Sequence, residues 1–302
     1  MLINNKRVLD IGTPLVYTKT KNKSTPKGKN PMNVGVIVHL RDTNADALIS
    51  KVRELGIDYC QLGCWNHSIL TPELAEAVKA ACERYNVRIS TVWVGWSGPA
   101  AWNFTEGPIT LGIVPVEYRY DRCRELMHGS DFAKMLGVDQ IATHMGFLPE
   151  NPTDPQYAPV VAAIKMVAKH CKANGQRLLF ETGQETPVTI LRVIEDSGCD
   201  NLGVNLDPAN LIMYGKANPV DALDVIGKYV FDVHGKDGKY PTSSKQLGAE
   251  MPIGEGAVNF PAFIGKLKEL GYDGCITIER EISGEKQIQD ILKAKEILEG
   301  LF

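Results

Sequence analysis

Eight short runs of mostly apolar residues follow one another along this chain, and segments with helical spacing separate them. The runs cover residues 35–40, 59–63, 88–94, 140–144, 177–181, 202–207, 229–234 and 275–279. Strands that lack polar alternation are typical of a parallel sheet that is covered on both faces. The spacing therefore predicts eight βα units and an α/β fold.

We predict that these units close into a (β/α)₈ TIM barrel. Such a barrel needs roughly 250 residues, and the chain has 302. An open, doubly wound sheet is the alternative, but no GxGxxG motif follows the first strand. The predicted organisation is a single domain over residues 34–302, preceded by an N-terminal extension over residues 1–33. Within that extension, residues 18–32 are polar and basic and contain Pro and Gly, which favours a loop or arm outside the barrel.

Composition excludes several classes of partner. The formal net charge is −3, which does not favour a nucleic acid. No apolar stretch approaches the ~20 residues of a membrane span, and the first residues lack the apolar core of a secretory signal. Seven cysteines without a CxxC pair indicate a reduced, cytoplasmic protein. The sequence allows a homo-oligomer and leaves the oligomeric state open.

Four of the last strands end in a side chain that can bind a divalent cation. These residues are Glu181, Asp207, His234 and Glu279, separated by 26, 27 and 45 residues, which is about one βα unit or slightly more. The carboxyl ends of all strands meet on one face of a parallel barrel, so the four side chains should converge. Side chains alternate between faces along a strand, and each of the four can point into the barrel. We therefore predict a metal site.

Three carboxylates and one imidazole suit a single Mn²⁺, Mg²⁺, Co²⁺ or Zn²⁺ ion. Such an ion could polarise a sugar carbonyl and acidify the neighbouring C–H group. A carboxylate would then remove the proton and form an enediolate. Return of the proton to the other side gives an epimer, and its return to the neighbouring carbon gives an aldose–ketose shift.

At these residues the chain resembles the xylose-isomerase-like TIM barrel superfamily, also called the sugar phosphate isomerase/epimerase family. The segments that carry the resemblance are Phe180-Glu-Thr-Gly183, Asn205-Leu-Asp-Pro-Ala-Asn210, Val233-His-Gly-Lys-Asp237, Gly254-Glu-Gly-Ala-Val-Asn-Phe-Pro261 and Ile278-Glu-Arg-Glu281. The resemblance implies that Glu181, Asp207, His234 and Glu279 bind the metal, and that Glu181 and Glu279 form the acid/base pair. Two positions depart from the 3-epimerases of the family, which tend to carry His where this chain has Asp232 and Asn210.

Six further residues are candidates for binding a small-molecule sugar or sugar derivative. His144 ends the fourth strand, Glu185 follows the fifth, and Lys236 shares the face of His234; these three and Asn210 offer polar contacts. Aromatic faces suit the apolar side of a sugar ring, which favours Trp65 and Trp96. The candidates are His144, Glu185, Lys236, Trp65, Trp96 and Asn210. For each of them a purely structural role is the alternative.

The expected function is therefore a divalent-metal-dependent isomerase or epimerase of a small sugar or ketose. One alternative is a metal-dependent lyase that dehydrates a keto-sugar or inosose, or that removes the aglycone of a 3-keto-glycoside. The other is a carbohydrate-binding barrel without catalysis.

Overall fold

Eight parallel strands close into a barrel in the computed structural model, which describes residues 32–302. Around the barrel the strands follow the order β1, β10, β7, β6, β5, β4, β3 and β2, and β2 pairs with β1. They are β1 (Asn33–Leu40), β2 (Tyr59–Cys64), β3 (Arg88–Val94), β4 (Gln140–Thr143), β5 (Arg177–Glu181), β6 (Leu202–Leu206), β7 (Val230–Gly235) and β10 (Cys275–Ile278). This topology confirms the predicted TIM barrel and excludes the open sheet.

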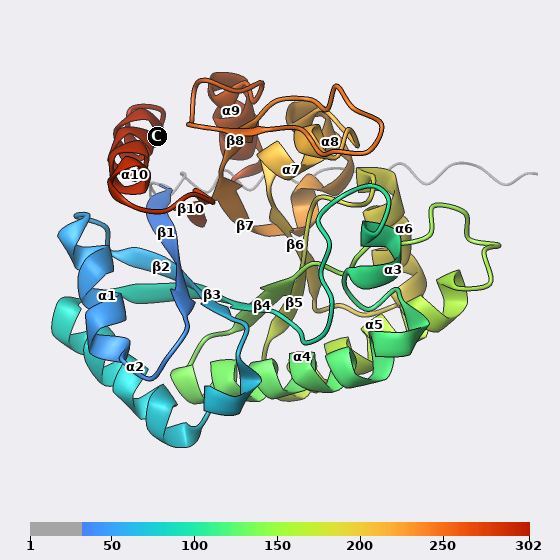
Figure 1. Cartoon of the computed structure of the whole chain (residues 1–302), viewed down its shortest axis with the longest axis horizontal. Coiled ribbons are helices and arrows are strands. Elements are labelled where there is room, and N and C mark those ends of the chain that lie inside the picture. The colour runs from blue at the N-terminus through green and yellow to red at the C-terminus, as the bar shows by residue number, and fades with distance from the viewer. Residues whose placement is uncertain (1–31) are drawn as a thin grey trace, which may run out of the picture. The chain divides into compact units, whose positions relative to one another are not determined.

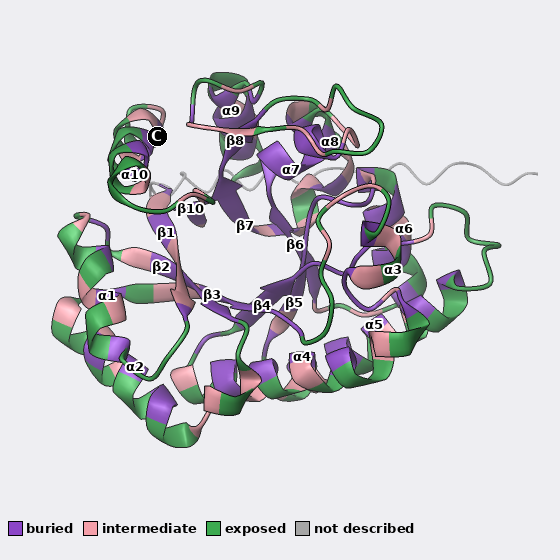
Figure 2. Ribbon diagram, viewed as in Figure 1, coloured by how far each residue is buried: buried purple, intermediate pink, exposed green. Residues whose placement is uncertain are grey.

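A helix follows each barrel strand, and Figure 1 shows the helices outside the ring of strands. They are α1 (Ala45–Glu54), α2 (Pro72–Tyr85), α4 (Val116–Leu136), α5 (Tyr157–Ala173), α6 (Pro187–Ser197), α8 (Pro219–Ile226), α9 (Phe260–Leu270) and α10 (Glu285–Glu299). The strands are largely buried, whereas the helices bury one face (Figure 2). Several helices begin with a side-chain N-cap followed by proline, as at Thr71 and Pro72 or Thr186 and Pro187.

Short elements that the sequence pattern does not predict lie in the loops. They are α3 (Gly107–Thr110), α7 (Pro208–Met213), the 3₁₀ turns η1 (His67–Ile69) and η2 (Gly227–Tyr229), and the antiparallel pair β8 (Asp237–Gly238) and β9 (Glu250–Met251). All except η2 follow the carboxyl end of a barrel strand. They therefore surround the face on which TIM barrels carry their active sites.

Three of the predicted strands extend one residue beyond the strands in the structure. His144, Asp207 and Glu279 each lie directly after the last residue of β4, β6 and β10. Their side chains therefore start from the loop at the mouth of the barrel, where the next element also helps to orient them.

Strand β7 contains an irregularity that simple alternation misses. Val204 and Asn205 are consecutive on β6 but pair with Val230 and Asp232, so Phe231 is an extra residue. Alternation predicts that Phe231 points toward the helices, but its ring packs with Leu179. A Cβ on Gly203 would clash with both of these side chains. The bulge keeps Asp232 and His234 inside the barrel while Phe231 also turns inward.

Asp237 holds the loop that follows β9. Its buried carboxylate accepts hydrogen bonds from the backbone N–H groups of Gly238, Gly254, Gly256 and Val258, at 2.8 to 3.0 Å. Asp237→Ala should lower the free energy of unfolding by about 3 kcal/mol or more, because four backbone donors lose their acceptor and two of them, Gly238 and Val258, are buried. Urea denaturation measures this loss. Alanine at the exposed Asp200 serves as the control and should change stability by less than about 0.5 kcal/mol; equal effects would contradict the assigned role.

Within residues 32–302, no helix combines the length and the apolar character that crossing a bilayer requires.

Strand β1 begins at Asn33, one residue before the predicted start of the barrel domain. Residues 1–31, which make up most of the predicted N-terminal extension, lie outside the described residues.

Candidate functional site

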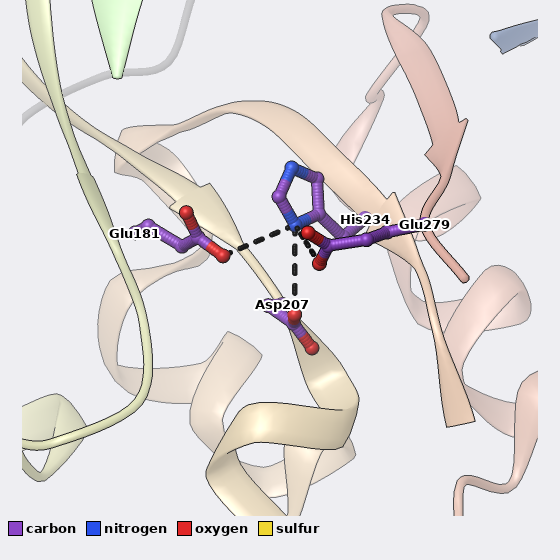
Figure 3. Close-up of side chains that lie close together, drawn as sticks. All are labelled: Glu181, Asp207, His234 and Glu279. Atoms are coloured by element: carbon purple, nitrogen blue, oxygen red, sulfur yellow. Dashed lines mark ion pairs between the residues drawn. The ribbon is translucent and has the colours of Figure 1, made fainter. Parts of the chain in front are cut away.

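Glu181, Asp207, His234 and Glu279 converge at the mouth of the barrel. Glu181 ends β5, Asp207 follows β6, His234 lies near the end of β7, and Glu279 follows β10. One potential ligand atom from each residue lies within 4.8 Å of the others. Figure 3 shows the three carboxylates grouped around the imidazole. The structure thus brings together all four residues that the strand-end pattern singles out.

The imidazole nitrogen Nδ1 of His234 is the centre of this cluster. It lies 3.2 Å from Glu181 Oε1, 3.3 Å from Glu279 Oε2 and 3.5 Å from Asp207 Oδ2. Glu181, Asp207 and His234 are almost completely buried, and Glu279 is only slightly exposed. A pocket that concentrates three carboxylates away from water needs a positive charge to balance them.

Local sequence explains how Asp207 is oriented. Asp207 is the N-cap of α7, and its Oδ1 accepts a 2.8 Å hydrogen bond from the N–H of Asn210. Pro208 follows as the first helical residue, a position in which proline is favoured. The cap uses one carboxylate oxygen, so the other oxygen, Oδ2, is directed at His234 and the cluster.

Glu181 is held from several sides. The indole N–H of Trp93 donates to its Oε2, and the side-chain amide of Asn210 lies 3.3 Å from its Oε1. His144 Nε2 lies 3.4 Å from the same Oε1. These contacts come from β3, α7 and the end of β4. They fix the carboxylate at the junction between the cluster and the cavity described below.

Lys236 adds a buried cation beside the cluster. Its Nζ lies 2.9 Å from Glu279 Oε2, 3.1 Å from Glu281 Oε1 and 3.6 Å from Asp207 Oδ2. When His234 is neutral, the three cluster carboxylates and Lys236 together carry a formal charge of −2. A divalent cation balances that charge.

Burial and neighbouring charges shift the pKa values of Glu181, His234 and Glu279 in opposite directions. Burial raises the pKa of Glu279, but Lys236 and His234 outweigh it and hold that pKa well below its usual value. Burial likewise raises the pKa of Glu181, and His144 and His234 reverse the effect. For His234, burial lowers the pKa, but Glu181 and Glu279 raise it well above the usual value. Both glutamates are therefore ionised at neutral pH, as ligands of a cation must be.

Two buried atoms support a cation at this point. Among the described residues, neither His234 Nδ1 nor Asp207 Oδ2 has a hydrogen-bond partner of good geometry. Buried polar atoms of this kind normally have a partner. Both atoms face the centre of the cluster, where oxygen and imidazole ligands suit Mg²⁺, Mn²⁺, Co²⁺ or Zn²⁺. The residues present therefore fit a divalent cation.

A cation titration tests this site directly. We expect one equivalent of Mn²⁺ to bind, and Asp207→Asn to weaken binding by more than about 100-fold, because even changes around the ligands cost 10- to 100-fold. Isothermal titration calorimetry measures both affinities. Asp139→Asn, at an exposed carboxylate just before β4, is the control and should bind like the wild type. Equal affinities of the Asp207 variant and the wild type would remove Asp207 from the ligand set.

A cavity of about 680 Å³ opens beside the cluster. Glu181 and Glu279 line it together with His144 and Asn210. Three tryptophans form an aromatic wall, which we define as Trp65, Trp93 and Trp102. The cavity thus joins two carboxylates to an aromatic surface, a combination that suits a polar ring with one apolar face.

The predicted substrate contacts divide into two groups. Trp65, His144 and Asn210 line the cavity, whereas Trp96, Glu185 and Lys236 do not. Trp96 is buried behind the aromatic wall, 5.4 Å from the guanidinium of Arg122. Glu185 is fully buried, and Lys236 contacts cluster carboxylates. Trp96 is therefore placed as a support of the aromatic wall and Lys236 as a support of the cluster, whereas Glu185 contributes to neither.

The sequence pattern does not single out several other residues that line the cavity. His39 and Arg41 come from the end of β1 and the loop after it, Tyr214 follows α7, and Leu247 lies in the loop between β8 and β9. His39 lies at a strand end like His144, which is a signal that could have identified it. Leu247 lies within a long polar loop, and nothing in the local sequence predicts its inward direction.

Comparisons with known proteins agree with this fold. The family model described as xylose isomerase-like TIM barrel matches residues 49–300. A xylose isomerase domain protein from Planctomyces limnophilus is 33% identical; the match covers 90% of this chain and 97% of that one, with a TM-score of 0.85. An uncharacterized protein of Methanocaldococcus jannaschii is 26% identical over 93% of this chain and 92% of its own length. A D-tagatose 3-epimerase-like protein, 22% identical, shares the fold with a TM-score of 0.69 over 89% of this chain and 97% of that one.

Proposed function

Because the chain belongs to the xylose isomerase-like TIM barrel family, we propose that it is a divalent-cation-dependent isomerase or epimerase of a small sugar or ketose derivative. The observation that carries this proposal is the position of Glu181 and Glu279. Each carboxylate belongs to the cation cluster and also lines the cavity. The similarity to a xylose isomerase domain protein and to a D-tagatose 3-epimerase-like protein supports the same class of reaction.

The bound cation would act as a Lewis acid that polarises the carbonyl of the substrate. The residues of the chain would then move the proton. Glu181 and Glu279 are ionised, so either can accept a proton from the carbon beside the carbonyl. One glutamate would remove the proton and later release it to solvent, while the other would take up a proton from solvent and return it to the substrate. Return at the opposite face of the same carbon gives an epimer, and return at the adjacent carbon gives an isomer.

Neighbouring side chains prepare Glu181 for this role. Trp93 occupies its Oε2, and Asn210 and His144 lie near its Oε1. These contacts restrict the rotation of the carboxylate, so it is positioned before the substrate arrives. His144 also lines the cavity and is placed to bind a sugar hydroxyl beside Glu181.

The aromatic wall supports a sugar as the substrate. Trp65 packs 5.1 Å from Trp93, measured between ring centroids, and Trp102 lies 5.1 Å from His144. Trp65 and Trp102 are partly exposed although both are large and apolar. The C–H face of a sugar ring would cover such surfaces, while its hydroxyls meet His144 and Asn210 on the polar side.

Solvent-deuterium incorporation tests the proposed reaction. The purified protein would first be analysed for bound metal, and then incubated in D₂O with ketoses, ketose phosphates, inososes and 3-keto-glycosides. We expect incorporation of one deuterium and conversion to an epimer or isomer of the same formula, observed by NMR. Loss of water or of an aglycone would identify a lyase instead. Absence of any exchange across the panel with the Mn²⁺-loaded protein would contradict the proposal.

A further inference from the structure

A group of hydrogen-bonded polar side chains lies inside the barrel, on the amino-terminal side of the cation cluster. Its members come from β2, β3, β4 and β7: Gln61, Ser90, Thr91, Gln140 and Asp232. Gln61, Thr91 and Asp232 are completely buried. The inside of a TIM barrel is usually filled by branched apolar side chains. A buried layer of polar side chains lowers stability unless all its groups are hydrogen-bonded. The presence of such a layer next to the cluster therefore suggests a role for it.

Asp232 is fixed as a hydrogen-bond acceptor. Its Oδ2 accepts from the hydroxyls of Ser90, at 3.1 Å, and Thr91, and its Oδ1 accepts from the N–H of Val233 at 2.9 Å. Consecutive residues Cys60 and Gln61 pair with Ile89 and Thr91, which leaves Ser90 as an extra residue of β3. This bulge lets two successive hydroxyls reach the same carboxylate. Asp232 therefore presents only acceptor atoms to its remaining neighbour, Gln61.

Gln61 connects Asp232 to the cluster. Its Nε2 donates to Asp232 Oδ2 at 3.4 Å, and its Oε1 lies 2.8 Å from His234 Nε2. Turning the amide over would place the oxygen of Gln61 against the carboxylate of Asp232, which is repulsive. The orientation that Asp232 imposes thus directs an acceptor at His234 Nε2, so Nε2 must carry the proton. Asn205 Nδ2 also lies 2.9 Å from Nε2, and this amide can turn to present Oδ1, which has no other hydrogen-bond partner in the part of the chain that the structure describes.

A neutral imidazole carries only one N–H. With the proton on Nε2, the bare Nδ1 faces three carboxylates at 3.2 to 3.5 Å. That arrangement is favourable only with a cation between them. We propose that Gln61 is a positioning residue that, oriented by Asp232, fixes the tautomer of His234 so that Nδ1 is the nitrogen offered to the cation. This inference rests on the proposed function, because it assumes that the cluster binds a divalent cation.

Zn²⁺ binding and NMR of the ¹⁵N-histidine-labelled full chain test this inference. In the Zn²⁺-loaded wild type, His234 should show its proton on Nε2; a His234→Gln spectrum identifies its signals among the six histidines. Gln61→Leu should weaken Zn²⁺ binding by about 10- to 100-fold and shift the Nε2–H signal, because only the Asn205 amide then remains beside Nε2 among the described residues. Asp232→Asn keeps the side-chain size but frees the Gln61 amide. It should weaken binding by a smaller factor and broaden or shift the same signal.

Gln176→Leu is the matched control, because Gln176 is an equally buried glutamine that bonds Ser130 and Val138 away from the cluster. It should leave Zn²⁺ affinity and the His234 signals unchanged even if it lowers stability. The inference is wrong if Zn²⁺-loaded wild type carries the proton on Nδ1. It is also wrong if Gln61→Leu keeps the Zn²⁺ affinity and the His234 signals of the wild type. If Gln61→Leu does not fold, the same criterion applies to Asp232→Asn. If the wild-type protein binds no divalent cation, the result would instead contradict the divalent cation assumed in the proposed function.

Discussion

Replacing Glu181 with glutamine should abolish solvent-deuterium incorporation into the substrate. Glutamine keeps the size of the side chain but cannot accept a proton, and general acid–base catalysis contributes about 10²- to 10⁴-fold to the rate. Glu181 is also one of the three carboxylate residues that surround His234 Nδ1, so the same change should weaken the proposed cation site. The initial rate of deuterium incorporation, measured by NMR at saturating Mn²⁺, determines the loss.

His144→Ala is the comparison for Glu181→Gln. His144 lines the cavity and lies 3.4 Å from Glu181 Oε1, but it is outside the cation cluster. Its loss should reduce the exchange rate without abolishing it. Circular dichroism and the unfolding midpoint establish that both variants are folded. Full activity of a folded Glu181→Gln variant would remove Glu181 as the base.

Glutamine at position 185 should stabilise the protein, and the gain should grow with pH. Glu185 is completely buried, and within residues 32–302 neither of its carboxylate oxygens has a hydrogen-bond partner of good geometry. Burial raises the pKa of this carboxyl from 4.5 to about 8, against smaller opposing effects of backbone N–H groups and Lys216. Between these two pKa values the folded chain holds a proton that the unfolded chain releases. Wild-type stability therefore falls as the pH rises through this window.

Glutamine does not titrate, so Glu185→Gln removes this pH-dependent loss. Each pKa unit corresponds to about 1.4 kcal/mol, so the advantage of the variant over the wild type should grow by roughly 3–4 kcal/mol between pH 5 and pH 8. Urea denaturation at several pH values measures the difference. Glu83→Gln, at an exposed position on α2, should instead follow the wild type. Parallel curves for the Glu185 variant and the wild type would show that Glu185 does not retain its proton.

The sequence alone predicts the barrel and the convergence of the four cluster residues because both depend on periodic features. Eight apolar runs fix the strands, and the ends of parallel strands must meet on one face, so Glu181 and His234 can be placed together without coordinates. Alternation fails where a strand contains an extra residue. Phe231 and Ser90 occupy such bulges, and their register depends on pairing with β6 and β2 rather than on their own segments.

The cavity beside the cluster is harder to predict for a physical reason. Its lining comes from loops whose direction is set by long-range packing. Leu247 reaches the cavity because Gly248 bonds Met213 and Lys239 bonds Ala249, contacts that no local pattern encodes. Gln61 is missed for a different reason. Gln61 is a single polar residue in an apolar strand. Its role can be inferred only from its contacts with Asp232 and His234, which lie more than 170 residues away in the sequence.

The four cluster residues and most of the aromatic side of the cavity come from different strands of the barrel. Strands β5, β6, β7 and β10 carry the four cluster residues, whereas β1 to β3 and the loops after them carry His39, Trp65, Trp93 and Trp102. Exchanging the loops after β1, β2 and β3 between relatives should therefore change this side of the cavity and leave the four cluster residues in place. In such an arrangement, substitutions in the loops can change the shape of the cavity without changing the residues of the cluster.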